Sequence, residues 1–115
     1  MNDGNHAIAD TPTEHPHIVR NPSICGGSPR IRNSRITVRH VALMVRDGDK
    51  PEDIAQSYPH LNLASVYDAV SYYLDHQSEI EQEILDNQIE NVLTKYGGSM
   101  DEKGVVHFPG VEAKE

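Results

Sequence analysis

Residues 51 to 76 constrain the fold more than any other stretch, because they predict two helices joined by a tight turn. Pro51 suits the first position of a helix, where its missing N–H costs nothing and its φ angle is already helical. Tyr58-Pro59 ends that helix, since a residue before proline is pushed out of the α region. Asn62 is a good N-cap for a second helix. The outline is that of a helix-turn-helix, which many α-helical corners without a nucleic-acid role share.

The predicted second helix carries apolar residues at steps of three and four, which buries one stripe. These residues are Leu63, Val66, Ala69, Val70, Tyr73 and Leu74. The same spacing continues from Ile80 to Tyr96. An unbroken helix from Leu63 to Tyr96 would be about 50 Å long, more than so small a domain can cover. We therefore predict a break near His76-Gln77-Ser78, with the distal helix packed in a dimer.

The chain before residue 47 predicts short strands followed by a helix. Residues 30 to 38 favour two short strands around an Asn33-Ser34 turn, because Asn tolerates the left-handed region better than most residues. Thr37 is placed to cap a helix from Val38 to about Arg46, and Gly48 ends it.

The predicted fold is mostly α-helical, and the chain falls into four segments. Residues 1 to 16 are expected to be a disordered leader, and residues 17 to 76 a β-hairpin plus helix-turn-helix domain. Residues 77 to 96 are expected to form a C-terminal helical extension, and residues 97 to 115 a flexible tail. With no Trp and one Phe, the core is small and aliphatic, so we expect a homodimer.

The composition also bounds the compartment. The single Cys25 excludes an internal disulfide framework and fits a reducing environment. No apolar run approaches the length of a membrane span, and the N-terminus lacks the pattern of a signal peptide. We expect a soluble cytoplasmic protein that does not bind membranes.

The net charge of −8 is unevenly distributed along the chain. Between Arg20 and Lys50 there are six Arg and one Lys against two Asp, whereas Pro51 to Thr94 contains no Lys or Arg. A phosphate-binding surface must therefore come from the first half, because the acidic helices repel DNA.

Several ordered blocks of sequence are spaced as in one known family. They are residues 21 to 31, 34 to 38, Gly48 with 51 to 54, 58 to 61, and 66 to 73. Through these blocks the chain resembles domain-of-unknown-function family four hundred and thirty-three, over roughly residues 18 to 84. The resemblance implies a homeodomain-like, three-helix helix-turn-helix fold. It also implies an antitoxin of a bacterial toxin–antitoxin pair, encoded beside a PIN-like ribonuclease toxin.

Two positions depart from the family pattern. Asn33-Ser34-Arg35 stands where the family usually has Gly-Thr-Arg, which changes the residue at the turn. Lys50 stands where the family usually has a Ser or similar cap before the helix that Pro51 opens. Neither change is expected to abolish the fold.

Seven residues are candidates for DNA binding: Arg30, Arg32, Arg35, Arg39, Asn62, Ser65 and Tyr67. Arginines of a hairpin and the following helix can contact phosphates or base edges, and the second helix of a helix-turn-helix enters the major groove. Arg30 and Arg32 fit DNA contact and plain solvation equally well, whereas the turn position of Arg35 favours a structural role. Asp68 argues for an ordinary packed second helix.

Val105, Val106 and Phe108 form a short apolar patch within a charged tail, and are candidates for binding a partner. An extended segment of this kind can add as a strand to a partner toxin. An inert tail with chance apolar residues is at least as good an interpretation.

No catalytic, metal or cofactor site is predicted. His15 and His17, with His6 nearby, lack a Cys or carboxylate at the usual ligand spacing. Acidic residues at helical spacing form a solvated face, and no nucleophile is paired with a base: Asp75, Glu79, Glu83, Asp86 and Glu90.

The leading hypothesis is an antitoxin that binds a PIN-like toxin and operator DNA, and that is not an enzyme. The alternative is a protein-interaction adaptor with the helix-turn-helix fold and no DNA binding. The resemblance favours the antitoxin, whereas the distribution of charge favours the adaptor.

Overall fold

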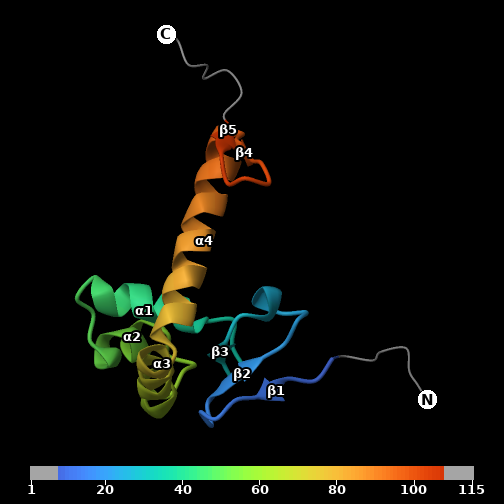
Figure 1. Cartoon of the computed structure of the whole chain (residues 1–115). Coiled ribbons are helices and arrows are strands. Elements are labelled where there is room, and N and C mark those ends of the chain that lie inside the picture. The colour runs from blue at the N-terminus through green and yellow to red at the C-terminus, as the bar shows by residue number, and fades with distance from the viewer. Residues whose placement is uncertain (1–7, 108–115) are drawn as a thin grey trace. The chain divides into compact units, whose positions relative to one another are not determined.

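A computed structural model describes residues 8 to 107 of the chain, which divide after Ile80 into two compact units. The first unit contains a three-stranded antiparallel sheet and most of the helices (Figure 1). The mostly helical fold predicted from the sequence is confirmed. Within the described range, no helix is both long and apolar enough to cross a membrane.

The sheet has the order β1-β2-β3, with strands Thr11–Pro12, Ile18–Arg20 and Arg30–Ile31. Val19 pairs with Pro12 on one side and with Arg30 on the other. Residues 8 to 16 thus take part in the fold, whereas the sequence predicted a disordered leader over residues 1 to 16. A two-residue strand gives no periodic signal, so β1 could not be recognised. Residues 1 to 7 lie outside the described range.

The turn at Asn33-Ser34 has the predicted left-handed residue, because Asn33 has a φ angle of 63°. The Ile31 N–H donates to the Ile36 carbonyl at 2.9 Å across this turn. The second predicted strand of the hairpin is reduced to a single bridge between Arg30 and Thr37, because helix α1 begins at once. The preceding connection from β2 contains the 3₁₀ helix η1, Cys25–Gly27.

Helices α1 (Val38–Arg46) and α2 (Pro51–Ser57) begin at the predicted residues. Thr37 Oγ1 accepts from the His40 N–H at 3.2 Å, which caps α1. Lys50 offers no side-chain cap to α2, but Asp53 Oδ2 accepts the Lys50 N–H at 2.9 Å. A carboxylate from the first turn therefore replaces the missing cap.

Helix α3 (Leu63–Asp75) lies between the α1–α2 pair and the sheet (Figure 1). Its cap is the predicted one, since Asn62 Oδ1 accepts the Ser65 N–H at 2.8 Å. The predicted buried stripe was partly wrong, because Leu63 and Leu74 are 40% and 62% exposed. The buried side chains of α3 face both neighbours instead: Ser65, Val66, Ala69 and Tyr72.

The core of the first unit is largely aliphatic, as predicted, and it also buries the ring of Tyr72. Its buried apolar side chains come from β2, β3, the four α-helices and the turn before α3: Ile18, Val19, Ile31, Val38, Val41, Ala42, Ile54, Leu61, Val66, Ala69, Tyr72 and Ile80. Because α3 contacts β2, β3, α1 and α2, it organises this core.

The predicted break is present at His76, whose φ and ψ of −127° and 43° are not helical. Helix α4 then extends over Gln77–Tyr96. It is followed by a hairpin of β4 (Ser99–Met100) and β5 (Val106–His107), in which Met100 pairs with Val106. The segment predicted as a flexible tail thus contains paired strands up to residue 107.

Candidate functional site

A pocket of about 280 Å³ lies at the N-terminal end of α3. It is lined by residues of the sheet, of the turn after β3, and of the start of α3: His17, Ile31, Arg32, Asn33, His60, Leu61, Asn62 and Ser65. The lining holds one arginine and two histidines but no carboxylate. Because the helix dipole adds positive potential at this end of α3, the pocket favours an anionic ligand.

Backbone geometry fixes the arginine of the pocket. The Arg32 N–H donates to the His17 carbonyl at 2.8 Å, which extends the pairing of β2 and β3 by one bond. The exposed guanidinium donates from Nη2 to the Pro16 carbonyl at 3.1 Å. The left-handed Asn33 then turns the chain away toward α1.

Three of the predicted DNA-binding residues meet in this pocket, namely Arg32, Asn62 and Ser65. Ser65 is buried and its hydroxyl donates to the Asn62 carbonyl at 2.7 Å, so it supports the end of the helix.

The other four predicted residues lie elsewhere. Arg30 is only 3% exposed and pairs through Nη2 with Asp10 Oδ1 at 2.9 Å, so it offers no surface to DNA. Arg39 Nη1 donates to Ser28 Oγ at 2.7 Å, and Arg35 is exposed outside the pocket. The Tyr67 hydroxyl donates to the Glu52 carboxylate, which links α3 to α2.

Of the predicted partner-binding residues, Val105 is exposed and Val106 lies in β5. Phe108 lies outside the described residues.

The sequence did not indicate His17, Asn33 and His60 as members of the pocket. His60 precedes the cap of α3 by two residues, so its place could have been inferred from the predicted turn. His17 could not, because it reaches the pocket through the pairing of β2 with β3.

A second group of polar side chains lies along α3 from Asp68 to its C-terminal end, and we call it the histidine–carboxylate cluster. Its members are Glu14, His15, Asp68, Asp75, His76 and Glu79. His15 is 8% exposed, with Nδ1 at 2.9 Å from Asp68 Oδ1 and Nε2 at 2.8 Å from Asp75 Oδ2. Burial lowers the pKa of His15, but the hydrogen bonds to the two carboxylates outweigh it, so the pKa is raised above its ordinary value.

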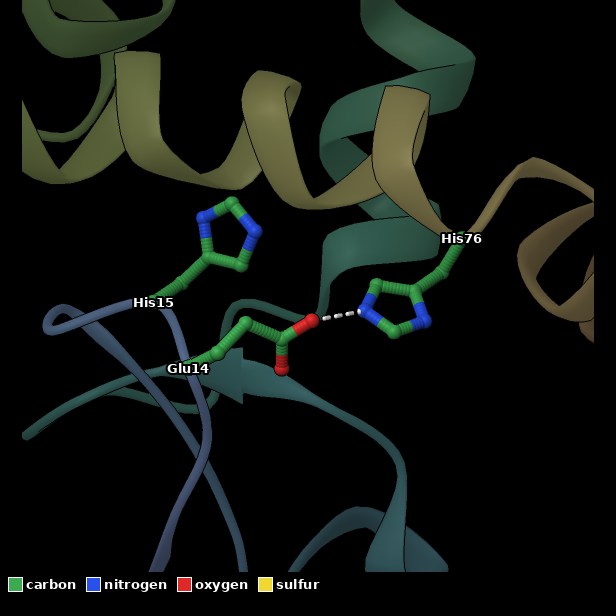
Figure 2. Close-up of side chains that lie close together, drawn as sticks. All are labelled: Glu14, His15 and His76. Atoms are coloured by element: carbon green, nitrogen blue, oxygen red, sulfur yellow. Dashed lines mark hydrogen bonds and ion pairs between the residues drawn. The ribbon is translucent and has the colours of Figure 1, made fainter.

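His76 lies at the C-terminal end of α3 and faces Glu14 (Figure 2). Its Nε2 is 2.5 Å from Glu14 Oε2, and its Nδ1 is 3.4 Å from Glu79 Oε1. The ring stacks on Tyr72 with centroids 4.1 Å apart. Backbone hydrogen bonding and the bond from His76 lower the pKa of Glu14.

Arg20 completes the surroundings of His76. Its Nη2 donates to the Tyr72 hydroxyl at 2.9 Å and to the Glu79 carboxylate. The strand β2 is thereby tied to the end of α3 and the start of α4.

Both a family model and a solved structure match this chain. The family model described as "Protein of unknown function (DUF433)" matches residues 18 to 73. The crystal structure at 2.00 Å of a DUF433 member protein from Anabaena variabilis ATCC 29413 is similar, with a TM-score of 0.57 and 32% sequence identity. The similarity covers 60% of this chain and 68% of that one. The chain belongs to the DUF433 family. A search of curated proteins gave no match.

The pocket and the histidine–carboxylate cluster differ in how much of each lies inside the DUF433 match. Most of the pocket lining lies inside residues 18 to 73, and His17 is the neighbour of its first residue. In the histidine–carboxylate cluster, only Asp68 lies inside the match. The cluster is thus built largely by segments that flank the DUF433 match.

Proposed function

We propose that this DUF433 protein is a DNA-binding, cytoplasmic antitoxin of a bacterial toxin–antitoxin pair. In this proposal α2, residues 58 to 62 and α3 act as a helix-turn-helix, with α1 completing a homeodomain-like set of three helices. The chain performs no catalysis. Its partners are operator DNA and a PIN-like ribonuclease toxin.

The single observation that carries DNA binding is the composition of the pocket at the start of α3. Arg32, His60 and Asn62 lie together there without a carboxylate. The second helix of a helix-turn-helix presents its N-terminal residues to DNA, and an arginine beside it is well placed to bind a phosphate.

Asp68 does not oppose this proposal, although its charge argued against DNA binding in the sequence. Its Oδ1 faces His15 and its Oδ2 accepts the His17 N–H at 2.8 Å. The carboxylate is thus turned toward the sheet and only 14% exposed. Asp68 is not among the residues that line the pocket.

Fluorescence anisotropy with the duplex upstream of the protein's own gene tests DNA binding. We expect preference over a scrambled duplex, and a binding constant that falls steeply as salt rises. Arg32→Ala should reduce the slope of log K against log salt by about one, because one phosphate contact is lost. The matched control is Arg46→Ala, an exposed arginine at the end of α1 outside the pocket.

Equal weak binding to both duplexes, or a slope unchanged by Arg32→Ala, would contradict this DNA-binding surface.

The antitoxin role follows from the family resemblance and is tested separately. Co-expression with the product of the neighbouring gene should restore growth if that product is a PIN-like toxin. Truncation after Gly98 removes the β4–β5 hairpin and its exposed Val105. We expect the truncated protein to lose the ability to neutralise the toxin. If it neutralises the toxin fully, the hairpin is not part of the toxin-binding surface.

A protein-interaction adaptor is the second candidate function, and an exposed apolar face favours it. Leu63, Tyr67 and Leu74 are 40%, 47% and 62% exposed, and their spacing places them on one side of α3. Toxin binding with no DNA binding under any salt condition would select the adaptor.

The proposed homodimer uses α4. Leu85 and Val92 are both exposed and seven residues apart, which is the spacing of a helix–helix contact. Light scattering after size exclusion should give twice the chain mass, and Leu85→Glu with Val92→Glu should give the monomer.

A further inference from the structure

Two histidines and one carboxylate converge at the end of α3 from distant parts of the chain. Glu14, His15 and His76 each place one ligand atom within 4.8 Å of the others (Figure 2). Two imidazole nitrogens and a carboxylate oxygen form a ligand set that divalent transition metals bind in proteins.

The hydrogen bonds around His15 indicate which nitrogen faces the shared space. Nδ1 lies beside Asp68, whose other oxygen is held by the His17 N–H. Nε2 lies beside Asp75, the chain neighbour of His76. His15 can therefore keep its Nδ1 proton on Asp68 and offer Nε2 to an ion.

His76 has the same arrangement. Its Nδ1 faces Glu79 at 3.4 Å, and its Nε2 faces Glu14 at 2.5 Å. Metal-ligating histidines usually donate their second N–H to a carboxylate, which fixes the tautomer and the ring orientation. Each histidine of the cluster has such an acceptor on the side away from the shared space.

We infer that Glu14, His15 and His76 form a binding site for a divalent transition-metal ion, for which Zn²⁺ is the probe. His15 Nε2, His76 Nε2 and the Glu14 carboxylate are the ligands. Asp68 and Glu79 orient the two histidines. Asp75, which is 2.8 Å from His15 Nε2, supplies a further oxygen.

The surroundings suit an ion that enters from solvent. The side chains of Glu14 and Asp75 are both 59% exposed, whereas His15 is buried and His76 is stacked on Tyr72. One side of the site is thus fixed by packing and the other is open. The Asp75 oxygen brings the protein ligands to four, which is the number that Zn²⁺ usually binds.

The ion links the chain before β2 to the break between α3 and α4. Its ligands come from residues 14 and 15 on one side and residue 76 on the other. These segments already meet through the hydrogen bond between His76 and Glu14 and through the edge contact of the His15 and His76 rings, and a bound ion stabilises this contact further.

Isothermal titration of chelator-treated full-length protein with Zn²⁺ tests the site. We expect one ion per chain and a rise of the thermal midpoint on loading. Glu14→Gln and His76→Ala should each weaken Zn²⁺ binding at least about tenfold. Co²⁺ should give a visible absorption band that both substitutions abolish.

His60→Ala is the matched control, because His60 is an exposed histidine outside the cluster. It should leave the Zn²⁺ affinity unchanged, as should Arg32→Ala, which separates this site from the DNA-binding pocket. Circular dichroism verifies that each variant folds. If His76→Ala does not fold, the test rests on Glu14→Gln alone. The inference is overturned if Zn²⁺ does not bind, or if Glu14→Gln binds it as tightly as the parent protein.

Discussion

The Nε2 atom of His15 lies 2.8 Å from Oδ2 of Asp75, and so joins two residues that are 60 positions apart. With Asp68 on the other ring nitrogen, His15 has an acceptor at both of its nitrogens. A neutral imidazole can donate at only one nitrogen, so the arrangement favours the imidazolium in the metal-free protein. The contact of His15 with the two carboxylates of α3 is thereby strongest when the imidazole is protonated.

We predict that the stability of the metal-free protein falls as pH rises through the pKa of His15. Because this pKa is raised on folding, the contribution of His15 is fully present below its unfolded value of about 6.5 and is lost above the folded value. Urea unfolding at about pH 6 and pH 8 measures the change. His15→Gln should show a smaller difference between the two conditions, and an equal difference would contradict the prediction.

Arg30 and Asp10 form one ion pair, and replacing each of them should change the free energy of unfolding in a different way. Arg30 is buried, and its Nε and Nη1 have no hydrogen-bond partner among residues 8 to 107. Arg30→Met should therefore leave the free energy of unfolding unchanged or raise it, since it removes the buried charge and its unpaired groups. Asp10→Ala should lower it, because it leaves the guanidinium buried without its carboxylate. A larger loss for Arg30→Met than for Asp10→Ala would contradict this account.

The turn at Asn33 predicts how the departure from the family pattern affects stability. Asn33 has a φ of 63°, which costs an ordinary side chain about 1 kcal/mol or more and glycine nothing. Asn33→Ala should lower the free energy of unfolding by about 1 kcal/mol. Asn33→Gly should leave it unchanged or raise it. Chemical denaturation of the two variants side by side makes the comparison.

Asn62 both lines the pocket and caps α3, so its replacement should lower the stability of the protein. Asn62→Ala should lower the free energy of unfolding by about 1 kcal/mol, because the Ser65 N–H loses its acceptor. Asn91→Ala, at an exposed position inside α4, is the control and should not lower it. Equal effects of the two substitutions would show that the Asn62 cap does not contribute to the free energy of unfolding.

The helices could be predicted because their signals are local. Thr37, Pro51 and Asn62 each act within their own first turn, and the break at His76 follows from the length of the pattern. The face of α3 was harder to predict, because the sheet and α1 together decide which side is buried. That is why Tyr72 is buried and Leu74 is exposed.

The polar sites depended on contacts that the sequence does not show. The sequence predicts no metal site at His15, because no Cys or carboxylate near it completes a ligand set at the usual spacing. Its carboxylates come from α3, at Asp68 and Asp75. Arg30 and Arg32 fitted DNA contact equally well in the sequence, but Arg30 lies in β3 and is buried in an ion pair with Asp10. Arg32 follows the strand and is exposed.

The stacking of Tyr72 on His76 gives the protein a built-in optical reporter. The chain contains five tyrosines and no tryptophan, so tyrosine emission is not masked by energy transfer to indole. The phenol of Tyr72 lies 4.1 Å from the imidazole of His76, centroid to centroid. A change in the contacts of that imidazole therefore changes the surroundings of a light-absorbing group that is itself buried. The state of the end of α3 can be followed by its own spectrum, without a label.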